Sequence, residues 1–219
     1  MTPEVLLQWV RGPGLQFAVG IFVIGMVYRV LHLAVLGRSK NLAVPRGSEW
    51  GPGLRMIWRR SFSLPQLSSR GKLTVFAGYV FHLGFLITLF FLSQHIDLFR
   101  SVLGFGWAAF PRGMVDIWAI LAIAALIVLL VHRFIDPVKW LLSDAEDYLT
   151  WAFTFLPLFT GFMLDHSAVL DYTRRMILHL GSVELLLVLI PFSKLAHMVT
   201  ILGARWYNGA IAGFKGVRP

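Results

Sequence analysis

The sequence predicts an all-α integral membrane protein: a bundle of five transmembrane helices that forms a single domain over residues 1–219. Hydrophobic residues make up 57% of the chain, and charged residues make up only 14%. A soluble domain carries about 25% charged residues. The mean hydropathy is +0.71, and the apolar residues lie in runs long enough to cross a bilayer. A water-soluble globular fold and a disordered chain are both excluded.

Five segments predict the spans, because a hydrocarbon core about 30 Å thick requires about 20 apolar residues in a helix. They cover about 14–36, 74–93, 114–131, 148–164 and 176–202. The fourth is the least apolar, and Pro191 predicts a kink within the fifth. The first lacks the basic segment and the small-residue cleavage site of a signal peptide, so we expect it to be retained.

The charges between the spans predict their orientation. The long loop at 37–72 contains one acid, Glu49, and eight bases: Arg38, Lys40, Arg46, Arg55, Arg59, Arg60, Arg70 and Lys72. The C-terminal tail adds Arg205, Lys215 and Arg218, whereas the opposite loops contain Arg100, Arg112, Arg174 and Arg175. The positive-inside rule therefore places the N-terminus outside and the basic loop and C-terminus in the cytoplasm, in a multi-pass protein of the cell inner (cytoplasmic) membrane.

Composition also limits the cofactors and partners. The net charge of +9 comes from bases at the ends of apolar runs, which argues against nucleic acid as a partner. There is no cysteine, so the chain itself holds no iron–sulfur cluster, zinc–thiolate site, covalently attached haem or disulfide. The basic loop, with Trp50, Met56 and Trp58 among its arginines, could dock an acidic soluble subunit or rest on anionic headgroups.

All seven histidines lie within the predicted spans or at their ends: His32, His82, His95, His132, His166, His179 and His197. Ionisable groups in membrane helices are costly, so each is a functional candidate. The alternative for any one of them is a packing residue or a residue at headgroup level. The spacing of the whole set decides which interpretation is favoured.

His179 and His197 are 18 residues apart, which is five turns of an ideal helix and about 27 Å along its axis. Both rings would then point the same way at two depths, as two bis-imidazole b-type haems stacked across a membrane require. Depth pairs His82 with His197 at the inner site and His95 with His179 at the outer site. However, His82 and His95 are about 140° apart on an ideal helix, so span two must bend, unwind or end near Ser93.

Other histidines compete for both sites. His166 is the rival outer ligand at the end of span four. His132, at the inner end of span three, and His32, in span one beside Arg29, are rivals at the inner site.

Two stretches of the sequence resemble a known family. Phe81-His82-Leu83-Gly84 resembles the start of the second helix of the respiratory nitrate reductase gamma subunit family, and the His179-to-His197 spacing matches that family's paired haem ligands. The run from Pro191 to Met198 (PFSKLAHM) resembles still more closely the related cytochrome b subunits of sulfate-reduction and heterodisulfide reductase complexes. The resemblance covers spans two to five.

The resemblance implies a dihaem cytochrome b that passes electrons between membrane quinone or quinol and a cytoplasmic iron–sulfur partner subunit of a respiratory oxidoreductase complex. It assigns His82 and His197 to the inner haem iron and His179 to the outer one. In that family the remaining outer ligand lies ten residues after the first, which is Leu92 here. We therefore expect His95 to replace it. Two haem b groups are expected, and one is the alternative.

The remaining polar residues have expected roles around these cofactors. Haem propionates require basic partners, for which Arg29, Arg133, Lys194 and Arg205 are candidates, although each could instead extend toward the headgroups. Glu184, the deepest acid, could relay protons or remain neutral and hydrogen-bonded. By analogy with the family, the quinone or proton site would lie near the outer haem, among Arg112, Asp116 and Glu184.

Two further functions stay open. One is a single-haem or structural membrane anchor, which would leave the 18-residue histidine spacing to chance. The other is a small-solute or proton transporter without haem, which the absence of internal repeats and of broken helices disfavours. In either cytochrome case, the chemistry on the terminal substrate belongs to another chain.

Overall fold

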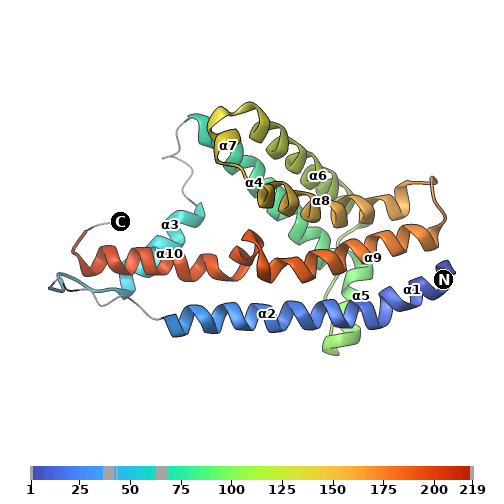
Figure 1. The fold of residues 1–219 in the computed structure, drawn as a ribbon, viewed down its shortest axis with the longest axis horizontal. Helices are drawn as coiled ribbons and strands as arrows, with labels where there is room; N and C mark the ends of the chain where they lie inside the picture. The colour runs from blue at the N-terminus through green and yellow to red at the C-terminus, as the bar shows by residue number, and fades with distance from the viewer. Residues whose placement is uncertain (1, 37–41, 43, 63–68, 218–219) are drawn as a thin grey trace. The chain divides into compact units, whose positions relative to one another are not determined.

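The computed structural model describes residues 2–36, 42, 44–62 and 69–217, and these residues form helices and no strand (Figure 1). Much of the predicted basic loop, at 37–41, 43 and 63–68, lies outside the described residues. The chain divides into two compact units. The first comprises Met1–Ala18 and Ser68–Leu186, and the second comprises Val19–Leu67 and Leu187–Pro219.

The first unit contains all or most of seven α-helices and one π-helical turn of the described chain. They are α1 (Pro3–Trp9), the π-helical turn η1 (Val10–Gly14), α4 (Ser69–Phe91), α5 (Ser93–Leu103), α6 (Arg112–Ile135), α7 (Pro137–Leu142), α8 (Ala145–His166) and α9 (Tyr172–Leu189). Asp136 caps α7, and Asp144 forms a capping box at the start of α8. These caps accept hydrogen bonds from backbone N–H groups of the first helical turn, which have no acceptor within the helix.

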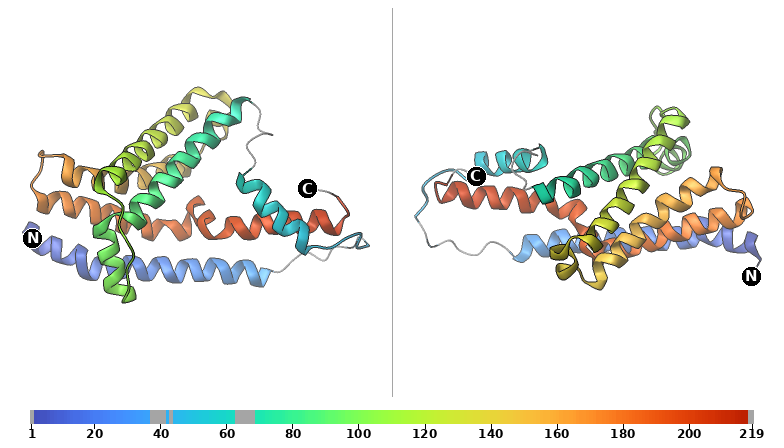
Figure 2. Two further views of the ribbon diagram at one scale, coloured as in Figure 1. Left: turned by 180° about the vertical axis from the view of Figure 1, so that it is seen from behind. Right: turned by 90° about the horizontal axis from the view of Figure 1, so that it is seen from above.

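Helices α4 and α6 lie side by side through small residues (Figures 1 and 2). A Cβ built on Gly84 would lie 2.9 Å from the Cβ of Ala122, so only glycine permits this approach. Small residues at such positions let membrane helices pack closely. Ala122 and Leu126 of α6 also pack with Leu158 of α8, and the indole of Trp151 donates to the carbonyl of Leu126 at 2.8 Å.

The second unit contains most of α2 (Leu15–Leu36), then α3 (Trp50–Phe62) and α10 (His197–Phe214). The sequence analysis placed residues 50–62 in the long basic loop at 37–72, and that prediction is wrong because they form helix α3. Pro52 lies in the first turn of the helix, where its missing N–H has no helical acceptor. Figure 2 shows α3 lying against α10.

Among the described residues, four helices are long and apolar enough to cross a membrane: Pro3–Leu36, Gly71–Phe91, Arg112–Ile135 and Tyr172–Phe192. They overlap four of the five predicted spans and support a multi-pass membrane protein. The first begins at Pro3 instead of near residue 14, because the helix continues through the π-helical turn that contains Pro13. The predicted span at 148–164 lies within α8, a helix of 22 residues that is not among the four.

The fifth predicted span is not one continuous helix. α9 ends at Leu189, two short 3₁₀ turns follow at Ile190–Phe192 and Lys194–Ala196, and α10 starts at His197. Ser193 between the turns is extended, with φ −121° and ψ 178°, and its hydroxyl accepts from the backbone N–H of Leu195. The carbonyl of Pro191, inside this break, accepts a 2.7 Å hydrogen bond from Arg29 Nε. The sequence predicted a kink at Pro191, and the structure has a complete break.

Candidate functional site

The clearest candidate site is a pair of histidines in the first unit. The rings of His95 on α5 and His179 on α9 have centroids 6.3 Å apart and planes inclined by 16°. Two metal–nitrogen bonds of about 2 Å each, with about 1 Å from each nitrogen to its ring centre, place two imidazole centroids about 6 Å apart. The two rings are stacked, and their centroid separation of 6.3 Å is close to this bis-imidazole distance.

Hydrogen bonds fix the tautomers of both rings. His95 Nδ1 lies 2.9 Å from the carbonyl of Thr88, which can only accept, so Nδ1 carries the proton. His179 Nδ1 lies 3.3 Å from Thr160 Oγ1, whose own proton goes to the carbonyl of Leu156 at 2.7 Å. Each Nε2 then keeps a lone pair, as in metal-bound histidines that donate through their other nitrogen. Burial also lowers the pKa of His95 below its ordinary value and so keeps it neutral.

A glycine and two hydroxyls position the His179 ring against α8. A Cβ on Gly161 would lie 2.9 Å from His179 Cε1, so the ring lies directly on the backbone of α8. Ser182 Oγ donates to the carbonyl of His179 at 2.7 Å and lies 3.1 Å from Thr160 Oγ1. The sequence analysis did not select Thr88, Thr160, Gly161 or Ser182, because small polar residues in apolar helices usually only pack.

His95 reaches this position because span two ends early. α4 ends at Phe91, Leu92 is extended with φ −75° and ψ 130°, and α5 starts at Ser93. The 140° offset of an ideal helix therefore does not apply between His82 and His95. The bend or end that the sequence required near Ser93 is present.

The predicted inner ligands lie in different units. His82 Nδ1 lies 2.6 Å from the carbonyl of Gly78, and His197 Nδ1 lies 2.8 Å from the carbonyl of Lys194. A carbonyl can only accept, so Nδ1 carries the proton in both residues. Since the helix breaks before His197, the five-turn argument for His179 and His197 does not hold.

The rival histidines have other surroundings. His166 stacks on Phe162 at 4.1 Å, and its Nε2 lies 3.6 Å from Asp116 Oδ2. His32 stacks on Tyr28 at 5.6 Å. The antiparallel contact of Gly84 with Ala122 sets His132 level with about residue 74, roughly 12 Å along the axis from His82.

Arg112 and Asp116 form an ionic cluster with the end of α8. Arg112 Nε lies 3.4 Å from Asp116 Oδ1, and Arg112 Nη2 pairs with Asp165. With His166, this cluster joins the start of α6 to the end of α8. Sequence reasoning missed Asp165, which looked like an ordinary residue at a helix end.

Glu184 faces a different element. Its Oε1 is buried and has no hydrogen-bond partner among the described residues. A Cβ on Gly14 of the π-helical turn would lie 2.8 Å from this oxygen and 2.6 Å from the Trp9 ring. Glu184 thus lies against η1, whereas His179 lies against α8. π-helical turns are often found at functional sites.

Three predicted propionate partners have acceptors or contacts within the second unit. Arg29 Nε donates to the carbonyl of Pro191, and Arg205 Nη1 donates to Ser61 Oγ at 2.7 Å. The carbonyl of Lys194 accepts from His197. Arg133, in the first unit, contacts Ser143 at 2.8 Å and Asp147 at 3.4 Å.

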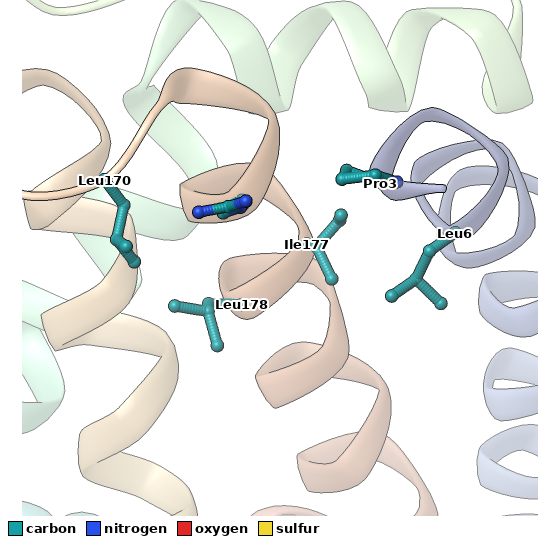
Figure 3. A pocket seen from close by; sticks show the side chains of 6 residues that line it. Pro3, Leu6, Leu170, Ile177 and Leu178 are labelled. Carbon is teal, nitrogen blue, oxygen red and sulfur yellow. The ribbon is translucent and has the colours of Figure 1, made fainter. Parts of the chain in front are cut away.

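A groove of about 350 Å³ lies beside the start of α9. Figure 3 shows Pro3 and Leu6 of α1 facing Ile177 and Leu178 of α9, with Leu170 alongside. The remaining lining residue, Arg174, also pairs with Asp171 at 3.2 Å.

Comparison with known proteins gives one relative and no family. No family model matches the sequence, and no solved structure matches it. A protein of Nitratidesulfovibrio vulgaris (strain Hildenborough), described as "Protein", is 27% identical over 212 residues, which cover 93% of this chain and 92% of that protein. Its description assigns no activity, so the function must be argued from the site.

Proposed function

We propose that this chain is a dihaem cytochrome b of the cell inner membrane, with five spans, a cytoplasmic C-terminus and no substrate chemistry of its own. It would pass electrons between membrane quinone or quinol and a cytoplasmic iron–sulfur subunit of a respiratory oxidoreductase complex. The observation that carries the proposal is the His95–His179 pair, with its 6.3 Å ring separation. The resemblance to the nitrate reductase gamma subunit family supplies the quinone and the iron–sulfur partner.

The composition of the donor set supports haem over a bare metal ion. Within the part of the chain that the structure describes, no group of three or more His, Asp or Glu residues could hold a metal. Two imidazoles alone suit a metal whose other ligands come from a macrocycle, as the axial ligands of b-type haem do. When bound, haem supplies one-electron redox chemistry. His95 and His179 would hold the outer iron, and His82 and His197 the inner one.

Neutral imidazole nitrogens are what such ligation requires of these side chains. Nδ1 of His95 contacts the carbonyl of Thr88, and Nδ1 of His179 contacts the hydroxyl of Thr160, so each of these rings is oriented and presents Nε2. Nδ1 of His82 and His197 contacts the carbonyls of Gly78 and Lys194, which orients those two rings. In the proposed reaction, Glu184 would carry protons near the quinone. The ionic cluster of Arg112 and Asp116 would provide hydrogen bonds to the quinone.

The test is a reduced-minus-oxidised optical spectrum of the purified chain, with the ratio of extracted non-covalent haem to protein. We expect about two haems per chain, one fewer in His95→Ala and in His179→Ala, and an unchanged ratio in His166→Ala. A chain folded under haem-replete conditions that contains no haem would overturn the proposal. A chain with one haem that is lost in His82→Ala and retained in His95→Ala would overturn the outer haem site and keep the inner one.

The transporter remains the second candidate because of one structural observation. The sequence disfavoured a transporter partly because no broken helix was predicted, and the fifth span is broken at residues 190–196. Broken helices near the membrane centre often build transport sites. Solute or proton uptake by haem-free protein in sealed vesicles would favour it over the cytochrome.

A further inference from the structure

Helix α3 has one face against α10 and one face exposed. On the inner face, a Cβ on Gly53 would lie 2.6 Å from the Trp206 ring, and a Cβ on Gly209 would lie 2.6 Å from Met56 Cβ. Arg205 donates to Ser61 at the other end of the same face. These contacts fix α3 along α10 within the second unit.

The exposed face, here called the outer stripe, consists of Leu54, Arg55, Trp58 and Arg59. These residues recur at the three- and four-residue spacing of one helix face. Leu54 is 59% exposed and Trp58 is 68% exposed, and both arginines are exposed. Leu54 and Trp58 lie one turn apart and are bordered by arginines, an arrangement that favours an interaction surface over a face turned only toward water.

We propose that α3 is an interfacial helix whose outer stripe lies on anionic lipid headgroups. Tryptophan and leucine on one face with arginine beside them are typical of helices that lie in the membrane interface. Residues 46–62 contain four arginines and one glutamate, a net charge of +3. Such a segment next to a span is attracted to anionic lipids.

Chain connectivity keeps α3 near the bilayer. Its last residue, Phe62, is seven residues before Ser69, the first residue of α4, whose apolar span begins at Gly71. Seven residues reach at most about 25 Å. In addition, the α10 segment that contacts α3 contains Arg205, Trp206 and Tyr207, residue types that anchor helices at membrane interfaces. These two constraints favour a lipid occupant over a soluble acidic protein.

The proposal does not depend on haem and is tested on the full-length protein. Because the chain has no cysteine, Leu54→Cys provides a unique thiol for a spin label. The labelled protein is placed in nanodiscs of phosphatidylcholine, with or without one-third phosphatidylglycerol. The readout compares collisions of the label with oxygen, which concentrates in lipid, and with a water-soluble nickel chelate. Trp58→Cys is the second labelling position.

We expect oxygen collisions to dominate at both positions in the anionic discs. Replacing Arg55 and Arg59 by glutamine should lower the ratio of membrane-bound to membrane-detached α3 by about five-fold per arginine. Removing two charges outside α3, with Arg11→Gln and Arg100→Gln, which the predicted topology places on the opposite side of the membrane, should leave the ratio unchanged. A label that stays open to the nickel chelate in both lipids would overturn the proposal. So would a label shielded from both reagents, which would indicate a protein on this face.

Discussion

The contact between Gly161 and His179 allows a sharp test of the outer site. In Gly161→Ala the new Cβ would lie 2.9 Å from His179 Cε1 and 3.2 Å from Nδ1. Ordinary contacts begin near 3.4 Å, so the ring must retreat by about 0.5 Å, which exceeds the roughly 0.2 Å tolerance of a metal–ligand distance. Overpacking of this kind costs about 1–3 kcal/mol. We therefore expect the affinity for the outer haem to fall by about 5- to 150-fold.

A matched control separates this effect from helix propensity. Gly181 is on α9, two residues from His179, and a Cβ there meets nothing within 4 Å. Both substitutions gain about 1 kcal/mol of helix propensity, but only Gly161→Ala displaces the ring. The assay titrates haem into haem-depleted protein and follows the optical spectrum. Equal haem affinities in the two variants would refute the proposed role of the His179 position.

Two further predictions concern stability. Gly84→Ala should destabilise the protein by about 1–3 kcal/mol, because the new Cβ would lie 2.9 Å from Ala122 Cβ at the α4–α6 contact. Gly78→Ala, on the same helix, is the control: its Cβ would meet nothing within 4 Å, so we expect no such loss. Denaturation in mixed micelles measures the stability of both variants. The backbone N–H of Lys139 holds the pKa of Asp136 below its ordinary 3.8. A lowered carboxyl pKa stabilises the folded state above that value, and this is lost as the pH falls through the folded pKa. The protection of the α7 amides against hydrogen exchange, taken relative to the intrinsic exchange rate at each pH, should therefore fall in acid. Asp136→Asn, which can still cap the helix, should remove that pH dependence.

The sequence predicted the helices well where hydrophobic runs define them and poorly where tertiary contacts do. Four predicted spans coincide with four apolar helices, since run length alone determines them. α3 was missed because Gly51, Pro52 and Gly53 are typical of a loop. Here the proline occupies a first turn, and Gly53 makes room for the Trp206 ring. Neither reason can be derived from local sequence.

The break after span two has no local sequence signal either. Residues 88–96 contain no proline and no glycine, so only the angular conflict between His82 and His95 pointed to it. In span five, Pro191 indicated a kink, but not the second 3₁₀ turn that follows Ser193. The exact depth and direction of His197 therefore could not be derived from an 18-residue count.

The break also accounts for the departure from the family spacing. The resemblance expects an outer ligand at the position of Leu92, but Leu92 is the extended residue between α4 and α5. A residue there leaves the α4 face and cannot present a ring from a continuous helix. His95 lies in the first turn of α5, where its N–H bonds to the carbonyl of Leu92 and its Nδ1 bonds back to Thr88 on α4. That bridge across the break orients the ring beside His179. In the proposed cytochrome, the outer ligand would therefore lie three residues after the family position because α4 ends at Phe91.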